Sequence, residues 1–209
     1  MIVGTGRLAE DGDRITVDYT GNLLSGKEFD SSKTSAPITF TLGKHMVIKG
    51  WDLGFSGMKV GGRRVLSIPP SMAYGDRELE GIPKNSTLVF DVRLLRVDKA
   101  NDKPAIEIEE LAPGAGPASK AGDTVDVFYT GMFLNGTKFD SNVGKSTFSV
   151  KLGSGGVIKG FDQGLTGMKA GGKRRVTIPS ELAYGSRGAG GVIPPDAALI
   201  FEIEITKIH

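Results

Sequence analysis

One stretch of the sequence occurs twice, and this duplication constrains the fold more than any single motif does. Residues 47–74 read V-I-K-G-W-D-L-G-F-S-G-M-K-V-G-G-R-R-V-L-S-I-P-P-S-M-A-Y. Residues 157–184 read V-I-K-G-F-D-Q-G-L-T-G-M-K-A-G-G-K-R-R-V-T-I-P-S-E-L-A-Y, at an offset of 110 positions (157 minus 47). A fixed internal offset marks repeated structural units, so we predict two copies of one fold. The 209 residues leave roughly 100 for each copy, enough to bury a core.

Each copy of this stretch has the pattern of a short helix followed by a strand. In the first copy, apolar residues spaced three and four apart lie on one helical face: Ile48, Trp51, Phe55 and Met58. Glycines at 57 and 61–62 then end the helix, because glycine accepts left-handed backbone. A basic, β-branched run that ends in proline follows, at residues 63–69 and 173–179. We expect its arginines and lysines to form a solvent-exposed strand face.

Alternating apolar residues predict further strands in both copies. They occupy residues 14–20, 38–42 and 88–94, and residues 124–130, 148–152 and 199–205. Several antiparallel strands with one buried face, and one short helix to cover it, make an α+β domain. The predicted boundaries are 1–98 for domain 1, 99–104 for a polar linker and 105–209 for domain 2.

The two copies differ in two places. Residues 106–111, I-E-I-E-E-L, alternate like a strand, and subtracting 110 places all of them before residue 2, so domain 1 has no sequence for most of this strand. Either domain 1 lacks an edge strand or the chain is part of a longer one, and we favour the second. The loop at residues 76–84 is charged, whereas its counterpart at 186–195 is apolar and rich in glycine.

Composition excludes several classes of function. There is no cysteine, which rules out disulfides, thiol catalysis and thiolate metal sites. The net charge of +2 is too balanced to indicate nucleic acid or a membrane surface. Since no apolar run approaches the roughly 20 residues that span a bilayer, and no signal peptide is visible, we expect a cytoplasmic or nuclear protein. We expect a monomer with no metal and no cofactor.

The ordered motifs Y-T-G, G-x-x-F-D, V-I-K-G-W/F, G-M-K-x-G-G-K/R-R, I-P, A-Y-G, I-P and L/I-V/I-F closely resemble those of the FKBP family. The motifs occur once in each half, so that the resemblance covers nearly the whole chain as two consecutive copies. It implies a five- or six-stranded antiparallel sheet wrapped around one short helix in each domain, in agreement with the α+β prediction. It also implies peptidyl-prolyl cis/trans isomerase activity on proline-containing peptides and proteins, and binding of macrolides such as tacrolimus and rapamycin.

In that family a shallow apolar pocket holds a proline ring, and the motifs carry its residues onto both copies. The catalytic positions would be Tyr19, Asp30, Ile48 and Tyr74 in domain 1, and Tyr129, Asp140, Ile158 and Tyr184 in domain 2. The substrate-binding positions would be Phe29, Ile38, Val47, Trp51, Ile82 and Phe90 in domain 1, and Phe139, Phe148, Val157, Phe161, Ile193 and Phe201 in domain 2.

The resemblance also assigns roles to the polar groups. The backbone N–H of Ile48 or Ile158 and the hydroxyl of Tyr74 or Tyr184 would hold substrate carbonyls, and the aspartate would polarise one wall. Two apolar positions depart from the family pattern. The floor is usually Trp, as at Trp51, but domain 2 has Phe161; the aromatic wall is kept at Phe148, but domain 1 has Ile38. These departures leave the relative activity of the two domains open.

The residue types suit the reaction that the resemblance implies. Rotation about an X-Pro bond meets a barrier of about 18–20 kcal/mol because the planar amide loses resonance. The twisted amide carries less charge separation, so an apolar site favours it. An alternative is a non-catalytic module that uses the pocket and loops 75–87 and 185–197 to hold a protein partner. An active isomerase would assist protein folding, with chaperones recruited through a segment outside this sequence.

Overall fold

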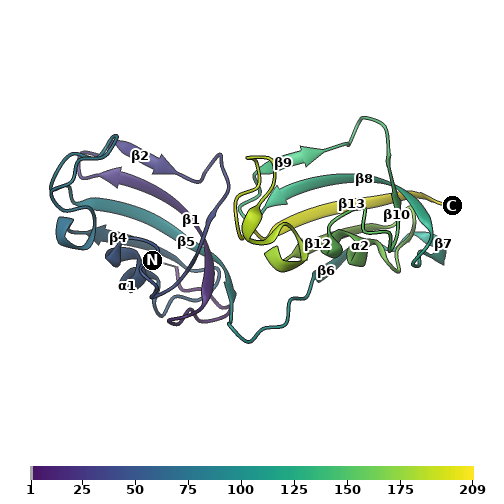
Figure 1. Cartoon of the computed structure of the whole chain (residues 1–209), viewed down its shortest axis with the longest axis horizontal. Helices are drawn as coiled ribbons and strands as arrows, with labels where there is room; N and C mark the ends of the chain where they lie inside the picture. Colours follow the sequence, from purple (N-terminus) through teal and green to yellow (C-terminus); the bar gives the residue numbers. More distant parts are fainter. Residues whose placement is uncertain (1) are drawn as a thin grey trace. The chain divides into compact units, whose positions relative to one another are not determined.

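The computed structural model describes residues 2–209, which divide into two compact units, one ending at Asp102 and the other beginning at Lys103 (Figure 1). Unit 1 contains β1 (Arg14–Leu23), β2 (Glu28–Ser31), β3 (Ile38–Thr41), α1 (Lys49–Phe55), β4 (Arg63–Ile68), the 3₁₀ turn η1 (Pro70–Met72) and β5 (Leu88–Asp98). Unit 2 contains β6 (Glu107–Ala112), β7 (Ala115–Ala118), β8 (Thr124–Phe133), β9 (Lys138–Ser141), β10 (Phe148–Lys151), α2 (Lys159–Leu165), β11 (Lys169–Ala170), β12 (Lys173–Ile178), the 3₁₀ turns η2 (Ser180–Leu182) and η3 (Gly185–Arg187), and β13 (Leu199–Ile208). No helix in residues 2–209 is long and apolar enough to cross a bilayer.

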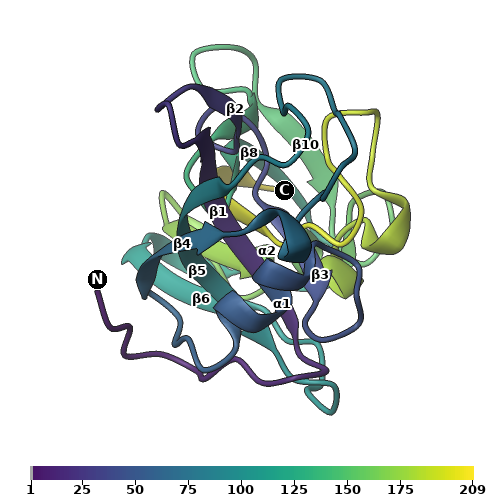
Figure 2. The ribbon, with the colours of Figure 1, turned by 90° about the vertical axis from the view of Figure 1, so that its left-hand side faces the viewer.

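Unit 1 is a five-stranded antiparallel sheet closed by one helix. The strand order is β2-β1-β5-β4, and β3 also pairs with β1. The long strand β1 therefore carries β3 beside its first half and β2 beside its second half. The inward residues of β1 and β5 are fully buried, among them Ile15, Val17, Val92 and Leu94. Figure 2 shows α1 in front of β1, β4 and β5, where it covers this apolar face.

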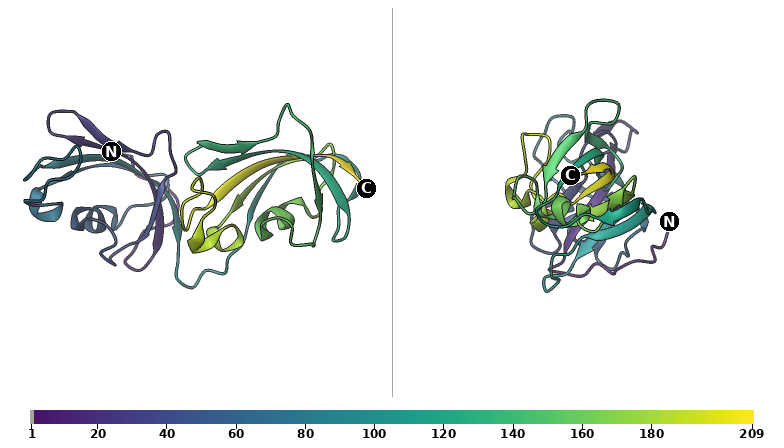
Figure 3. Two further views of the ribbon diagram at one scale, coloured as in Figure 1. Left: turned by 45° about the horizontal axis from the view of Figure 1, so that its top comes forward. Right: turned by 90° about the vertical axis from the view of Figure 1, so that its right-hand side faces the viewer.

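Unit 2 repeats this arrangement with one more strand. Its six-stranded sheet has the order β10-β8-β13-β12-β6, with β9 paired to β8, and β7 and β11 form a separate two-stranded ladder. Lys173 of β12 pairs with Ala112 of β6, and the equivalent position in unit 1 is an isolated bridge between Arg63 and Ile2. In each unit the sheet curves around its helix (Figure 3). The predicted α+β class, with five or six strands and one short helix, is confirmed.

Glycines bring each helix close to a strand. A Cβ atom at Gly50 of α1 would lie 2.4 Å from Cγ2 of Ile68 on β4, and one at Gly160 of α2 would lie 2.2 Å from Cγ2 of Ile178 on β12. Real Cβ atoms do not approach other atoms so closely, so a larger residue at either position would displace the helix. A helix-interior glycine costs up to about 1 kcal/mol relative to alanine. Its presence in both helices fits a requirement for this close packing.

The prediction that the basic run forms a solvent-exposed strand face is wrong for Arg174. Only 9% of Arg174 is exposed. Its guanidinium donates to the carbonyl oxygens of Gly164 (2.8 Å) and Thr166 (2.9 Å), and to Glu110 of β6 (2.6 Å). The last carbonyls of a helix lack partners within the helix, so this side chain satisfies the C-terminus of α2. Arg64 makes the same kind of contact to the end of α1.

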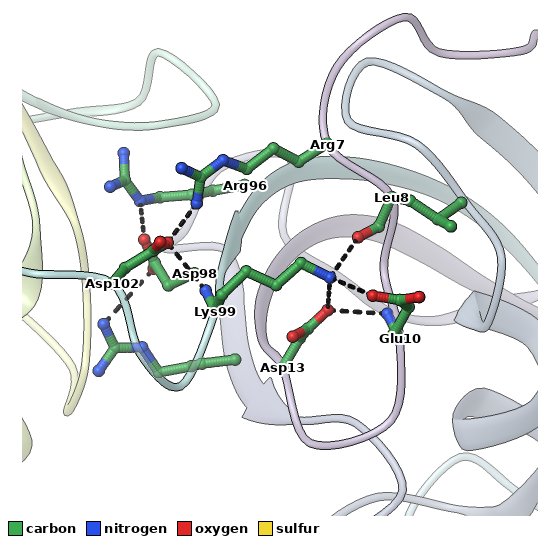
Figure 4. Close-up of polar contacts among 9 residues, drawn as sticks. Arg7, Leu8, Glu10, Asp13, Arg96, Asp98, Lys99 and Asp102 are labelled. Atoms are coloured by element: carbon green, nitrogen blue, oxygen red, sulfur yellow. Dashed lines mark hydrogen bonds and ion pairs between the residues drawn. The ribbon is translucent and has the colours of Figure 1, made fainter.

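The end of β5 is tied to the N-terminal segment of unit 1 through Lys99 (Figure 4). The ammonium group donates three hydrogen bonds, to the Leu8 carbonyl (3.0 Å), to Glu10 (2.6 Å) and to Asp13 (2.7 Å). The bond to Asp13 is the main cause of the raised pKa of Lys99. Asp102 accepts the backbone N–H of Lys99 at 3.0 Å and pairs with Arg7. These contacts hold residues 99–102, part of the predicted linker, to unit 1.

Candidate functional site

The predicted aromatic residues of unit 1 meet in one cluster. The Trp51 ring of α1 lies 5.1 Å from Tyr19 of β1 and 5.2 Å from Phe90 of β5, between ring centroids. Phe29 of β2 lies 5.6 Å from Phe90. All three pairs are edge-on, the arrangement that aromatic rings favour, and each adds about 0.5–1.5 kcal/mol beyond burial. Side chains from one helix and three strands thus form a single apolar cluster.

Most of the other predicted residues of unit 1 pack against the same core. The core cluster contains Trp51, Ile82 and Phe90, and the partly buried side chains packed on it include Tyr19, Phe29, Val47, Ile48 and Tyr74. Ile38 is the apolar position that stands apart. It begins β3, is 37% exposed, and is not part of this cluster of described residues. Its branched side chain supplies no ring, whereas the equivalent residue of unit 2, 110 positions later, is Phe148.

Gly21 allows the phenylalanine rings to approach each other. A Cβ atom at this position would lie 2.7 Å from Cζ of Phe29 and 2.8 Å from Cε1 of Phe90. Gly131 has the same place in unit 2, where a Cβ would lie 2.6 Å from the Phe139 ring. The Y-T-G motif is visible in the sequence, but nothing in its spacing assigns this role to the glycine. The reason becomes clear only when the strands that carry the two rings are paired.

A tyrosine–aspartate hydrogen bond lies at the cluster in both units. The Tyr19 hydroxyl donates to Oδ2 of Asp30 at 2.6 Å, and Oδ1 of Asp30 accepts the backbone N–H of Ser31 at 2.8 Å. Burial, and then the hydrogen bond to Asp30 and its charge, raise the pKa of Tyr19 well above the usual value. In unit 2, Tyr129 donates to Asp140 at 2.6 Å, and burial followed by this bond raises the pKa of Tyr129 to about 12. Both phenols therefore stay protonated near neutral pH.

The donors at the cluster that have no acceptor within residues 2–209 include one backbone N–H and one hydroxyl. One is the backbone N–H of Ile48, which precedes α1 in an extended conformation and so lies outside the hydrogen-bonded turns of the helix. The other is the hydroxyl of Tyr74. Tyr74 also contributes to the raised pKa of Tyr19, which indicates that the two phenols are neighbours. Ile158 and the 38% exposed Tyr184 repeat these features in unit 2.

A turn in the loop after η1 brings Ile82 to the cluster. Ile82 and Leu79 exchange two backbone hydrogen bonds of 3.0 Å, and Ile82 is only 6% exposed. A Cβ atom on Gly81 would lie 3.5 Å from Cβ of Phe29, which places this turn against the aromatic residues. In unit 2, Ile193 is 8% exposed and is held by a similar bridge to residue 189. Each isoleucine is thus buried, although its loop lies at the surface.

The aromatic cluster of unit 2 has a different composition. Tyr129 lies 5.8 Å from Phe161 and 6.1 Å from Phe148, and Phe201 lies 5.1 Å from Phe161 and 5.7 Å from Phe139, between ring centroids. Phe148 therefore adds a ring that unit 1 lacks. The remaining predicted residues, Val157 and Ile158, are half-buried and directly precede α2.

The structure adds residues to the clusters that sequence reasoning assigned only to the core or left out. Phe40 and Phe55 lie 5.8 Å and 5.5 Å from Trp51, and Phe133 lies 5.1 Å from Phe139. Trp51 also has an indole N–H that is buried and lacks a hydrogen-bond partner among residues 2–209. The phenyl ring of Phe161, at the same place in unit 2, has no such group.

Comparison with known proteins shows the same duplication. The sequence model of the family described as FKBP-type peptidyl-prolyl cis-trans isomerase matches residues 5–95 and again residues 116–206. Peptidyl-prolyl cis-trans isomerase FKBP10 of Homo sapiens is 40% identical over 206 residues, which cover 97% of this chain and 35% of the relative. Peptidyl-prolyl cis-trans isomerase FKBP9 of Mus musculus is 38% identical over 205 residues, which cover 97% of this chain and 36% of the relative. FK506-binding protein 4 of Neurospora crassa is 60% identical over 95 residues, which cover 46% of this chain and 20% of the relative.

This chain spans about a third of the length of the FKBP10 and FKBP9 relatives. The two matches of the family model fall on the two units, and each includes the tyrosine–aspartate pair and the residues that precede the helix. The matched residues form two α+β units of one architecture. The chain therefore belongs to the FKBP-type peptidyl-prolyl cis-trans isomerase family.

Proposed function

We propose that each unit is a peptidyl-prolyl cis/trans isomerase and that the aromatic cluster binds the proline ring of its substrate. The observation that carries the proposal is the presence, in both units, of two donors that lack partners among the described residues, beside an aromatic cluster. These donors are the N–H of Ile48 and the hydroxyl of Tyr74, with Ile158 and Tyr184 in unit 2. A substrate peptide offers the carbonyl oxygens that such donors require.

The geometry suits rotation about an amide bond. The donors hold carbonyl oxygens on either side of the proline, so that the substrate is oriented while the X-Pro bond turns. The apolar surroundings favour the twisted amide over the more polar planar forms. Asp30 is already held by the Tyr19 hydroxyl and the Ser31 N–H, so its charge remains fixed at one side of the site. The reaction makes and breaks no covalent bond.

The same groups support binding of macrolides and a role in protein folding. A macrolide such as tacrolimus or rapamycin presents a ring and carbonyls that match the aromatic cluster and its donors. One relative, in Neurospora crassa, is named for FK506 binding. Uncatalysed X-Pro isomerisation takes tens to hundreds of seconds and can limit folding. Proline-containing proteins that fold slowly are therefore the substrates we propose.

A pair of substitutions in each unit tests this function in the full chain. Asp30→Val removes the carboxylate of unit 1, and Asp140→Val removes that of unit 2. We expect each variant to lose part of the isomerase activity on a short proline peptide, and the double variant to approach the uncatalysed rate. Leu24→Ala is a matched control, because Leu24 is 72% exposed in the β1–β2 turn. Circular dichroism verifies folding, and a double variant that retains the wild-type rate would contradict our assignment of the site.

A second candidate function is protein binding without turnover in one or both units. The observation that favours it is the difference between the two loops beside the clusters. The loop of unit 1 is charged and exposes Leu79 (41%), whereas that of unit 2 is rich in glycine and exposes Val192 (57%). Two units that only catalysed the same reaction on the same substrates would not need different loops. Rapamycin binding without any acceleration of proline isomerisation would favour this function.

A further inference from the structure

We propose that Asp52 is a positioning residue for the site of unit 1. Its buried carboxylate holds the loop at residues 43–46, and through this loop it fixes the Val47 side chain and the backbone N–H of Ile48. The inference rests on the proposed function, since Val47 and Ile48 belong to the proposed substrate site. Asp52 itself need not touch the substrate.

The hydrogen bonds of Asp52 reach both ends of this segment. The side chain is 7% exposed, and its Oδ1 accepts the Gly43 N–H at 2.9 Å while Oδ2 accepts the His45 N–H at 3.2 Å. The imidazole of His45 lies 3.4 Å from the same Oδ2. The backbone N–H of Asp52 donates to the Ile48 carbonyl at 3.4 Å. One residue therefore holds the segment before and after Val47.

The backbone of His45 indicates that this contact restrains the loop. His45 has a φ of 56°, in the left-handed region that residues with a Cβ atom rarely adopt. Such a conformation persists only where its surroundings hold it in place. His45 is exposed, with a side-chain exposure of 84%, so packing does not supply the restraint. The hydrogen bonds that the Asp52 carboxylate accepts from Gly43 and His45 supply it.

In unit 2 the equivalent aspartate, Asp162, has one backbone donor from the loop where Asp52 has two. Its loop reads S-G-G where unit 1 has K-H-M, and Gly155 takes the left-handed φ of 75° without the strain of a side chain. Both oxygens of Asp162 lie near a single donor, the Gly153 N–H, at 3.1 Å and 2.9 Å. An asparagine at this position would still offer one oxygen to its one donor. At position 52 it would offer one oxygen where two donors need separate acceptors.

Substitutions at Asp52, made in the ¹⁵N-labelled full chain, test the proposal. The variants are Asp52→Ala and Asp52→Asn, with Asp162→Asn for comparison and Leu53→Ala as a control, since Leu53 lies on α1 and is 58% exposed. Two measurements are made well below the melting temperature. The first is the amide chemical shift of Ile48 and of Ile158. The second is a rapamycin titration followed by Trp51 fluorescence, which reports on unit 1 because the chain has a single tryptophan.

We expect Asp52→Ala to shift the Ile48 amide signal and to weaken rapamycin binding in unit 1 by roughly tenfold, the equivalent of one net hydrogen bond. Asp52→Asn should fall between this variant and the wild type. Asp162→Asn should change the Ile158 signal less than Asp52→Asn changes that of Ile48. A residue with a purely structural role would lower stability but leave the affinity of the folded unit unchanged, so the titration separates the two roles.

Wild-type affinity and an unmoved Ile48 signal in folded Asp52→Ala would overturn the proposal. If that variant does not fold, Asp52→Asn decides by the same two measurements. Equal effects of Asp52→Asn and Asp162→Asn would also count against the inference, because they would remove the distinction between two donors and one. If wild-type unit 1 neither binds rapamycin nor isomerises proline, the proposed function fails. The Ile48 signal in the variants still tests the role of Asp52 in that case.

Discussion

Replacing Gly50 by alanine tests how closely α1 must pack on β4. The three atoms nearest to a Cβ at this position all belong to Ile68, at 2.4, 2.8 and 2.9 Å. Ile68 is 3% exposed and paired with Leu88 on β5, so its side chain has little space into which to move. The added methyl group must therefore push the helix away from the strand or force Ile68 out of its preferred rotamer.

The cost can be estimated from two opposing effects. Overpacking a core costs about 1–3 kcal/mol, and a β-branched residue such as Ile68 is stiff about χ1, which favours a value near 3. Alanine regains about 1 kcal/mol over glycine in a helix interior. The net loss in the free energy of unfolding is then about 2 kcal/mol. With a urea m-value of about 2 kcal/mol/M, the midpoint should fall by about 1 M.

Urea unfolding followed by fluorescence measures this loss in the full chain. Trp51 is the only tryptophan, so its transition reports on unit 1. The double variant with Ile68→Ala removes all three clashing atoms, and the effects of the two substitutions should therefore be less than additive. A midpoint for Gly50→Ala equal to or above that of the wild type would refute the reasoning. It would show that α1 can shift on β4 without loss of stability.

Three further predictions concern other parts of the two units. Lys99→Met should lower the urea midpoint of the Trp51 transition, because Asp13, with a side chain only 8% exposed, loses its cationic partner; an unchanged midpoint would show that the Lys99 contacts do not stabilise unit 1. Trp51→Phe should change the melting temperature little, since it removes a buried N–H that has no partner within residues 2–209 and gives unit 1 the residue that unit 2 has at Phe161. A large fall in the melting temperature measured by circular dichroism would contradict this. The pKa of Tyr129 in the folded state, about 12, lies above the usual value of about 10, so the folded state keeps its proton longer than the unfolded state does. Stability should therefore fall as the pH rises from about 10 to 12, and Tyr129→Phe should reduce this dependence in urea melts at fixed pH.

Much of the fold follows from the sequence because local and repeated signals agree. The offset of 110 predicts two similar units, and Gly57, with a φ of 73°, ends the helical stretch close to where the pattern places its end. The extent of β5 is harder to predict from the sequence. The alternation is clear over residues 88–94, yet the strand continues to Asp98 because a bulge opposite Thr16 and Val17 restores its pairing with β1. A bulge of this kind depends on pairing with the partner strand, so the sequence of β5 alone does not indicate it.

The clustering of the aromatic residues could be predicted from motif order. The roles of the polar residues that hold the neighbouring helix and loop in place could not. Arg174 lies in a basic run that resembles an exposed strand face, and its burial depends on the end of α2 lying above it and Glu110 lying beside it. Asp52 is one of many acidic residues, and only the return of the loop brings Gly43 and His45 to its oxygens. In both cases the role depends on segments that are distant in sequence and adjacent in space.

The two units also serve as a comparison within one chain. Both keep the tyrosine–aspartate bond at 2.6 Å and, before the helix, an N–H that finds no acceptor within residues 2–209. They differ in the groups that a ligand's side chains would meet: Trp51 against Phe161, Ile38 against Phe148, and a charged loop against an apolar one. In the proposed function, the shared groups orient the substrate amide, and the differing groups contact what is attached to it. We therefore expect the two units to share a reaction and to differ in the substrates on which each is most effective.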